Sequence, residues 1–360
     1  MTKFIIRRLL QAIPTLFGIT ILTYLILVAA PGDPVTILTF DPNQFNSREL
    51  VERVGARLGV NDPLPVQYLR WLLGDDWMRW DSDGDGLADG SFLIPLDADG
   101  DGEPEPPGER RGIIRGDFGT SFVYNRDPLE LIGARLPATL ELNVAVLVVG
   151  LTLGIPLGVY AAIKRGGWFD NSTRLFAVIG NAVPDFWMGF VMIIIFGAIL
   201  GILPLGGRND PIGFRDPYPP IWERWNYLVM PTLVSALGVI AGYSRYMRTS
   251  MLETINSDFV RTARAKGLTN TTVWFKHAFR NSMIPLATFL GPTLFSLLGG
   301  SVVIERIFSW PGVGLLLLEA VNNQDFPVVM ASTFIFSTLT IFGYLMSDIL
   351  YAIFDPRIRY

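Results

Sequence analysis

Two acidic segments carry the residues with the clearest chemistry in this 360-residue chain. Residues 81–89 and 97–105 both follow the pattern D-x-D-x-D-G-x-x-[DE]. Alternating carboxylates with a glycine at the sixth position match the first nine positions of an EF-hand calcium loop. The carboxylates that we expect to bind calcium are Asp81, Asp83, Asp85, Asp89, Asp97, Asp99, Asp101 and Glu105.

The two loops depart from an EF-hand at their ends. Phe92 and Gly108 stand at the twelfth positions, where an EF-hand has a bidentate glutamate. The proline-rich residues 104–107 also argue against a flanking helix pair. The loops therefore resemble the calcium loops of extracellular repeats, which typically bind calcium with a dissociation constant of about 10⁻⁴–10⁻³ M. The alternative is a solvated acidic linker that binds no metal.

Other kinds of site have little support in this composition. The chain has no cysteine, which excludes disulfides and thiolate metal sites, and its one histidine is His277. A zinc hydrolase or a Ser-His-Asp enzyme would have to be built around that one residue. The phosphate-binding pattern GxxxxGK[ST] is also missing. We therefore expect neither an enzyme active site nor an ATP site in this chain.

The elements that would position such sites are membrane helices. Half of the residues are hydrophobic and 17% are charged, below the roughly 25% that is usual for soluble domains. A helix needs about 20 apolar residues to cross the hydrocarbon core. We predict an all-α membrane protein with six transmembrane helices, within residues 9–30, 142–163, 175–203, 228–244, 284–304 and 326–347.

Lysine and arginine residues indicate how these helices are oriented. With the N-terminus in the cytoplasm, the short inside segments carry fifteen basic residues and the two short outside loops carry four. Residues 31–137 would lie outside and hold 20 acidic and 10 basic residues, against 13 and 19 in the rest of the chain. We therefore predict that both termini are cytoplasmic. The first apolar run exceeds the roughly 7–15 residues of a cleaved signal peptide, so we expect an uncleaved anchor.

Three acidic residues fall within or beside these stretches. Asp185 follows Pro184 in the middle of the third stretch, where an ionised carboxylate is costly. We expect Asp185 to line a translocation path; the alternatives are an internal hydrogen-bonding role or a break of the helix at Pro184. Glu141, and Glu305 with Arg306, fall at the outer ends of the second and fifth stretches, so we expect them at the membrane interface.

Residues 245–283 form the longest predicted cytoplasmic loop. Gly267 can end one helix of this loop, and Thr269 or Asn270 can begin the next. The loop is thus predicted to be a helix–glycine–helix elbow on the inner membrane surface. Such an elbow either anchors itself in the interface or docks into a groove of another protein.

The sequence of this elbow resembles that of a known family. Residues 258–268 (DFVRTARAKGL), followed by residues 277–281 (HAFRN) and Pro285, resemble the EAA loop of permeases in binding-protein-dependent ABC importers, in its dipeptide and oligopeptide form. The resemblance extends over nearly the whole chain except roughly residues 75–112. The other similar blocks are residues 6–10, 14–15, 31–34, 58–59, 63–68, 116–121, 135–140, 348–351 and 355–359.

The resemblance implies the type I ABC importer permease fold, with six transmembrane helices and an extracytoplasmic lobe between the first and second. Residues 1–30 would hold the N-terminal cytoplasmic end and the first helix. Residues 31–137 would form the lobe, with the acidic insertion at about 75–112. Residues 138–360 would form the permease core with five helices and the coupling loop, residues 251–283.

The resemblance also implies a function and a set of partners. The chain would form half of a translocation pathway for di- and oligopeptides in the bacterial cytoplasmic (inner) membrane, surrounded by lipid. It would pair with a second homologous permease, with two cytoplasmic ATPases that bind ATP and Mg²⁺, and with an extracytoplasmic binding protein. No nucleic acid is expected, and no cofactor other than calcium. The residues implied in ATPase coupling are Arg261, Ala263, Arg264, Ala265, Gly267, Leu268, His277 and Arg280; the family's glutamate falls at Arg261.

Several alternatives remain at this stage. The same importer mechanism can carry oligosaccharides or nickel chelates, because substrate choice rests largely on the separate binding protein. A stand-alone secondary transporter would need an internal repeat or paired intramembrane charges, and the sequence displays neither. A calcium-sensing membrane protein would use the acidic insertion as its functional part.

Overall fold

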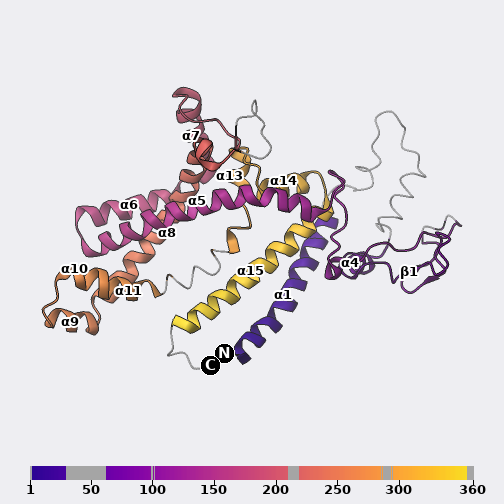
Figure 1. The fold of residues 1–360 in the computed structure, drawn as a ribbon, viewed down its shortest axis with the longest axis horizontal. Helices are drawn as coiled ribbons and strands as arrows, with labels where there is room; N and C mark the ends of the chain where they lie inside the picture. The colour runs from indigo at the N-terminus through magenta and orange to yellow at the C-terminus, as the bar shows by residue number, and fades with distance from the viewer. Residues whose placement is uncertain are drawn as a thin grey trace. The chain divides into compact units, whose positions relative to one another are not determined.

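The computed structural model describes residues 2–29, 62–98, 100, 102–209, 219–284, 286, 293 and 295–354. These residues fall into two compact units, which Figure 1 shows in one ribbon. The core unit consists of residues 1–12, 135–316 and 338–360. The lobe unit consists of residues 13–134 and 317–337. Three long helices and one short helix contribute residues to both units.

Most of the described chain is helical. The elements that lie mainly in the core unit are α5 (Pro128–Ile163), α6 (Trp168–Ala182), α7 (Asp185–Met192), η2 (Ile193–Ile199), η4 (Ile221–Glu223), α8 (Trp225–Ile255), α9 (Asp258–Ala265), α10 (Asn270–Thr272), η5 (Val273–Ala278), α11 (Phe279–Ser282), α13 (Val302–Ile307) and α15 (Phe326–Phe354). The segments η2 and η5 are π-helical, and η4 is a 3₁₀ turn.

The lobe unit contains most of one long helix and several shorter elements. They are α1 (Thr2–Ala29), α4 (Leu64–Leu73), β1 (Arg79–Trp80), β2 (Gly90–Ser91), η1 (Ile113–Arg115) and α14 (Val313–Asn322). The strands β1 and β2 pair antiparallel, with Arg79 opposite Ser91. The first acidic segment is therefore the loop of a β-hairpin. Neither of its ends continues into a helix, in agreement with the expected departure from an EF-hand.

The predicted membrane helices are confirmed in part. Among the described residues, four helices are long and apolar enough to cross a membrane: Ile6–Ala29, Pro128–Ile163, Trp225–Ile255 and Phe326–Ser347. The prolines inside α5 and α8 do not interrupt these helices. Helix α8 continues eleven residues beyond the predicted end at Ser244, so the first part of the predicted loop is helical.

Two predicted helices take another form. The stretch 175–203 is bent by 96° between α6 and α7, where Pro184 precedes the first turn of α7. Proline has no N–H to donate and clashes with the preceding turn, so a continuous helix was the wrong prediction here. Within the stretch 284–304, residues 285, 287–292 and 294 lie outside the described residues. Its described end breaks at Gly300, which has a φ of 69°, before the separate helix α13 begins at Val302.

A stripe of glycines on α5 brings this helix unusually close to α8 (Figure 1). Gly150, Gly154 and Gly158 recur at every fourth position and therefore lie on one face. A Cβ on Gly154 would stand 3.0 Å from Cβ of Tyr243, and one on Gly158 would stand 2.7 Å from Cβ of Met247. Small residues at such spacing allow helix backbones to pack closely in membranes, where apolar surface alone gives no preference for protein over lipid.

The glycine stripe leads to a stability prediction. We expect Gly158→Ala to destabilise the purified protein by about 1–3 kcal/mol, because the new methyl group overpacks the contact with α8. Gly133→Ala, on the same helix, is the matched control because nothing lies within 4 Å of its added Cβ. That control should leave the thermal unfolding temperature unchanged or slightly raised. Equal unfolding temperatures for the two variants would contradict the close contact.

Candidate functional site

The predicted elbow is present, and one of its sides is buried. Helix α9 ends before Gly267, which has a φ of 76°, and Thr269 Oγ1 then accepts the N–H of Thr272 at 3.4 Å as the cap of α10. Serines connect the far end of the elbow to α8: Ser250 Oγ donates to the carbonyl of Ser282 at 2.9 Å. The buried side of the elbow consists of Val260, Ala263, Val273 and Ala278, which pack with Met247 and Met251 of α8.

The opposite side of the elbow faces out of the chain. Of the residues implied in coupling, Ala263 is buried with 6% exposure and His277 is half-buried. The exposed ones are Arg261, Arg264, Ala265, Gly267, Leu268 and Arg280. The apolar side chains Phe259, Leu268 and Phe275 are between 39% and 45% exposed. The elbow thus has cationic and apolar side chains together on its exposed side. Its other side packs against α8.

Asp185 occupies the first turn of α7, at the bend. The break that sequence analysis named as an alternative is therefore present. The Asp185 side chain is exposed on this single chain, as are those of Phe186 and Trp187 beside it. No ion pair with Asp185 occurs in the described residues. Its carboxylate is therefore available to whatever faces this surface.

Glu141 is buried between two arginines, and its expected position at the membrane interface stays a prediction. Arg208 donates to Glu141 Oε2 at 2.6 Å, and Arg224 donates to Oε1 at 2.5 Å and to Oε2 at 2.7 Å. All three side chains are at most 10% exposed. The arginines lie 67 and 83 residues further along the chain, so nothing near Glu141 in sequence indicated its partners. This triad fastens the segment before α8 to helix α5.

Glu305 is also buried within the protein, with an exposure of 0%, whereas Arg306 is exposed. Its Oε1 accepts Thr139 Oγ1 at 3.1 Å, and its Oε2 accepts the backbone N–H of Leu315 at 2.7 Å. Thr139 Oγ1 in turn accepts the N–H of Val313 at 2.8 Å. Glu305 and Thr139 thus satisfy N–H groups of the first turn of α14, which would otherwise have no partner. Together they join α5, α13 and α14.

The first acidic loop brings three carboxylates together. Asp81, Asp83 and Asp89 can each place one oxygen within 4.8 Å of the others. The N–H groups of Gly84 and Gly86 hold the pKa of Asp81 below its ordinary value, and the Ser82 hydroxyl does the same for the pKa of Asp89. Asp85 accepts the N–H of Leu87 at 2.8 Å and is not part of this cluster.

The second acidic loop repeats the backbone geometry of the first. Asp97 accepts the N–H groups of Gly100 and Gly102, as Asp81 accepts those of Gly84 and Gly86. The four glycines all have φ between 76° and 87°. Asp99 and Asp101 lie outside the described residues. Glu105 is buried and forms an ion pair with Arg79, so its carboxylate contributes to the base of the insertion.

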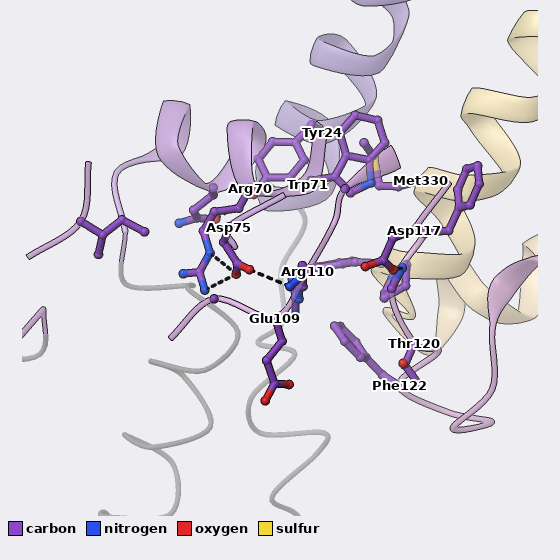
Figure 2. A pocket seen from close by; sticks show the side chains of 18 of the residues that line it. Tyr24, Arg70, Trp71, Asp75, Glu109, Arg110, Asp117, Thr120, Phe122 and Met330 are labelled. Carbon is purple, nitrogen blue, oxygen red and sulfur yellow. Dashed lines mark hydrogen bonds and ion pairs between the residues drawn. The ribbon is translucent and has the colours of Figure 1, made fainter. Parts of the chain in front are cut away.

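The base of the insertion is attached to the lobe unit by further ion pairs (Figure 2). Arg70 on α4 donates to Asp62 at 2.5 Å and to Asp75 at 2.9 Å, and Asp75 also accepts the backbone N–H of Arg110 at 2.8 Å. Arg115 pairs with Asp76 at 2.5 Å, which holds the pKa of Asp76 below its ordinary value. Beside these pairs lies a cavity of about 1150 Å³ that sequence analysis did not predict.

Comparison with known proteins assigns this arrangement to a family. Residues 154–360, which include the elbow, match the family described as the inner membrane component of binding-protein-dependent transport systems. The chain belongs to this family. Residues 1–79 match the N-terminal part described for the same kind of membrane component. The two acidic loops fall between the two matched regions of this family member.

Curated relatives cover the whole length of this family member. The oligopeptide transport system permease protein AppB of Bacillus subtilis is 39% identical over 363 residues, covering 100% of both chains. A putative peptide permease of Brucella suis and the dipeptide transport system permease protein DppB of Escherichia coli K12 are each 34% identical, covering 100% of this chain and 99% of theirs. The likeness is therefore to complete permeases.

The Glu141 triad leads to a second prediction. Glu141→Gln would remove the carboxylate charge that both buried arginines contact, so we expect it to destabilise the core by about 3–5 kcal/mol. The measurement is the thermal unfolding temperature of the purified protein in detergent. Glu130→Gln on the exposed part of α5 is the control and should change the stability by less than about 0.5 kcal/mol. If both substitutions lower the unfolding temperature equally, the triad does not stabilise the core.

Proposed function

We propose that this chain is the permease subunit of an ABC importer that takes up di- and oligopeptides. The observation that carries the proposal is 39% identity, over the full length of both chains, with a permease named for oligopeptide transport. The 34% identity with a dipeptide permease supports the same substrate class. In this role the chain forms half of a pathway through the bacterial inner membrane and pairs with a second permease. Oligosaccharides and nickel chelates remain substrates to be tested against peptides.

The elbow is proposed to dock cytoplasmic ATPases, which supply ATP hydrolysis from outside this chain. Its buried side packs on α8, and Arg264, Lys266 and Leu268 are exposed on the other side. A rigidly attached knob with apolar and cationic groups fits a groove of a partner protein. The distribution of lysine and arginine supports a cytoplasmic position of both termini, and therefore of the elbow. An extracytoplasmic binding protein then delivers substrate to the opposite side of the membrane. There it enters the pathway that the six proposed helices help to form.

Asp185 is proposed to line the pathway. A carboxylate within a membrane span needs a polar surrounding, and this one is exposed at a bend of the chain. A pathway between two permeases would provide water and, at times, the ammonium group of a peptide. The stand-alone transporter and the calcium sensor named above have no such support from relatives.

The deciding experiment isolates the native assembly. The tagged chain is extracted gently from its own membrane, and the co-purifying proteins and small molecules are identified by mass spectrometry. The proposal expects a second permease, ATPases and a binding protein that carries peptides. Sugars or nickel chelates on that binding protein would disprove the substrate class while keeping the mechanism. Recovery of the chain alone would disprove the importer.

Gly267 provides a test of coupling. Only glycine adopts its φ of 76° without strain, although asparagine tolerates this region better than other residues. An added Cβ meets nothing within 4 Å, so Gly267→Val strains the elbow without a clash. We expect at least a tenfold loss of peptide uptake, corresponding to about 1.4 kcal/mol, with normal amounts of subunit in the membrane. Gly267→Asn should retain most of the uptake, and full uptake by the valine variant would refute coupling through this turn.

We also propose that the acidic insertion binds calcium. The support is the oxygen cluster of Asp81, Asp83 and Asp89, together with a second loop of the same backbone geometry. Each loop binds a cation through acidic side chains and backbone carbonyls, as oxygen ligands suit calcium. The bound ion would make the insertion rigid near the docked binding protein. This role is independent of the importer mechanism.

Calcium titration of the complete purified protein tests this proposal. Trp80 lies next to Asp81, so its fluorescence should change with a midpoint of about 10⁻⁴–10⁻³ M calcium and return on addition of a chelator. Asp81→Asn combined with Asp83→Asn should abolish the change from the first loop. Asp127→Asn is exposed and far along the chain from both loops, and it should behave like the wild type. No chelator-reversible change would rule the calcium loops out.

A further inference from the structure

A pocket of about 480 Å³ lies at the turn between α5 and α6 and is here called the turn pocket. Its volume falls within the roughly 300–1,000 Å³ that is usual for pockets that bind small molecules. Two cations line it together with aromatic and aliphatic groups, all from one continuous stretch of the core unit. The side chains of the lining are those of Tyr160, Ile163, Lys164, Arg165, Trp168 and Phe169.

The turn that carries these residues is fastened to α8. The N–H of Gly166, which has a φ of 76°, donates to Asp170 at 2.9 Å. Asp170 is buried, with 1% exposure, and accepts two N–H groups of Arg248 on α8 at 2.5 Å and 2.8 Å. The turn is therefore fixed by the protein's own contacts, which lowers the entropic penalty of binding a ligand.

Lys164 and Arg165 give the turn pocket its charge. Both side chains are exposed, and neither forms an ion pair or a side-chain hydrogen bond within the part of the chain that the structure describes. The acidic residue that follows them in the chain, Asp170, is already paired with Arg248. Two adjacent cations attract an anion, and a guanidinium matches the oxygens of a phosphate group in geometry. The charge of the turn pocket therefore favours a phosphate.

The turn pocket lies where one apolar helix ends and the next begins. The membrane-length helix Pro128–Ile163 ends directly before Lys164, and the bent pair of helices that can form a further span begins at Trp168. Trp168 is 82% exposed, and tryptophan is enriched at the boundary between lipid tails and water. We therefore expect the pocket at the level of the phospholipid headgroups, where basic pockets bind anionic lipids.

The uncharged part of the lining suits the rest of a phospholipid. Ile163 and Phe169 are half-buried, and Tyr160 and Trp168 are exposed, so apolar surface lies directly beside the two cations. The glycerol part of a lipid can pack against the two exposed rings, whose hydroxyl and indole N–H can donate to its oxygens. A free phosphate ion would use the cations alone and leave this apolar surface in water. A phospholipid uses both.

One ring joins the turn pocket to the elbow. The ring centroid of Tyr160 lies 6.4 Å from that of Phe169 and 6.1 Å from that of Phe275 in η5, and both pairs are edge-to-face. Phe275 is one of the apolar groups on the exposed side of the elbow. A lipid that packs against Tyr160 therefore restricts a ring that contacts the elbow directly.

We propose that the turn pocket binds one anionic phospholipid, with its phosphate at Lys164 and Arg165 and its glycerol part against Tyr160 and Trp168. Through Tyr160 and Phe275 the bound lipid also restrains the elbow. The site is separate from Asp185 and from the acidic insertion, and it does not depend on which substrate the chain transports. Anionic lipid is then a specific ligand of this subunit as well as its solvent.

Photolabelling in lipid nanodiscs tests this site. The full-length purified chain is placed in phosphatidylcholine nanodiscs that contain a minor share of phosphatidylglycerol with a diazirine on its headgroup. We expect adducts on residues 160–169, displaced by unlabelled phosphatidylglycerol but not by additional phosphatidylcholine or by glycerol phosphate in the buffer. Displacement by soluble glycerol phosphate would reveal a site for a free phosphate compound and overturn the lipid. Labelling spread evenly over the membrane-facing helices would overturn the pocket.

Two paired variants make the test specific. Lys164→Gln with Arg165→Gln should lower the labelling of residues 160–169 at least about tenfold, since each cation near an anionic membrane surface contributes about fivefold to binding. Its unfolding temperature in phosphatidylcholine should equal that of the wild type, because both side chains are exposed. Arg174→Gln with Arg245→Gln removes the same charge from exposed positions outside the lining and should label like the wild type. An equal loss in both pairs would mean a general effect of surface charge and overturn the site.

Hydrogen–deuterium exchange tests the contact with the elbow. Replacing phosphatidylcholine by phosphatidylglycerol should slow the exchange of backbone amides in residues 273–278 of the wild type. The chain with Lys164→Gln and Arg165→Gln should not respond to the same replacement. Unchanged exchange in the wild type, beside specific labelling of the pocket, would overturn the effect on the elbow while the lipid site stands.

Discussion

The close contact between α5 and α8 is the interaction on which the core unit depends. Gly154 and Gly158 allow backbone to approach backbone, and this contact is needed because lipid solvates apolar side chains as well as protein does. One end of the contact continues into the cluster that holds the elbow, where Met247 and Met251 of α8 meet Val260 and Ala263. Toward the other end, α5 carries Glu141 and Thr139, which tie it to the segment before α8 and to α13 and α14. The helix pair α5 and α8 thus positions the elbow at one end of the core unit. Toward the other end, the same pair is joined to α13 and α14.

The lobe unit is stabilised to a large part by buried ion pairs. Among its described residues few large side chains are buried, and its segments are joined by ion pairs that are shielded from water, such as Arg70 with Asp62 and Asp75. The acidic loops beyond this base are exposed and are shaped by hydrogen bonds from glycine N–H groups to Asp81 and Asp97. The insertion therefore has a fixed base and a highly charged outer part.

Local features of the sequence predicted what depends on local interactions. The apolar runs identified the long helices, and Gly267 with Thr269 identified the turn and cap of the elbow. The features that the sequence did not indicate concern groups whose partners are distant in sequence. Glu141 meets arginines 67 and 83 residues away, and Glu305 meets Thr139 across 166 residues. No local pattern encodes such a pairing. The cavity of about 1150 Å³ was missed for the same reason, since residues from separate segments of the chain line it.

The π-helical segment η5 has a consequence for how the elbow tolerates change in length. A π turn contains one residue more than the α-helical turn it replaces. Deleting one residue between Val273 and Ala278 would therefore restore ordinary α winding while the residues that follow keep their faces. Arg280 would stay on the outward side of the elbow. A deletion of one residue in the regular helix α9 would instead rotate the residues after it by about 100° around the helix axis. The elbow should therefore tolerate the loss of one residue within η5 better than the loss of one residue within α9.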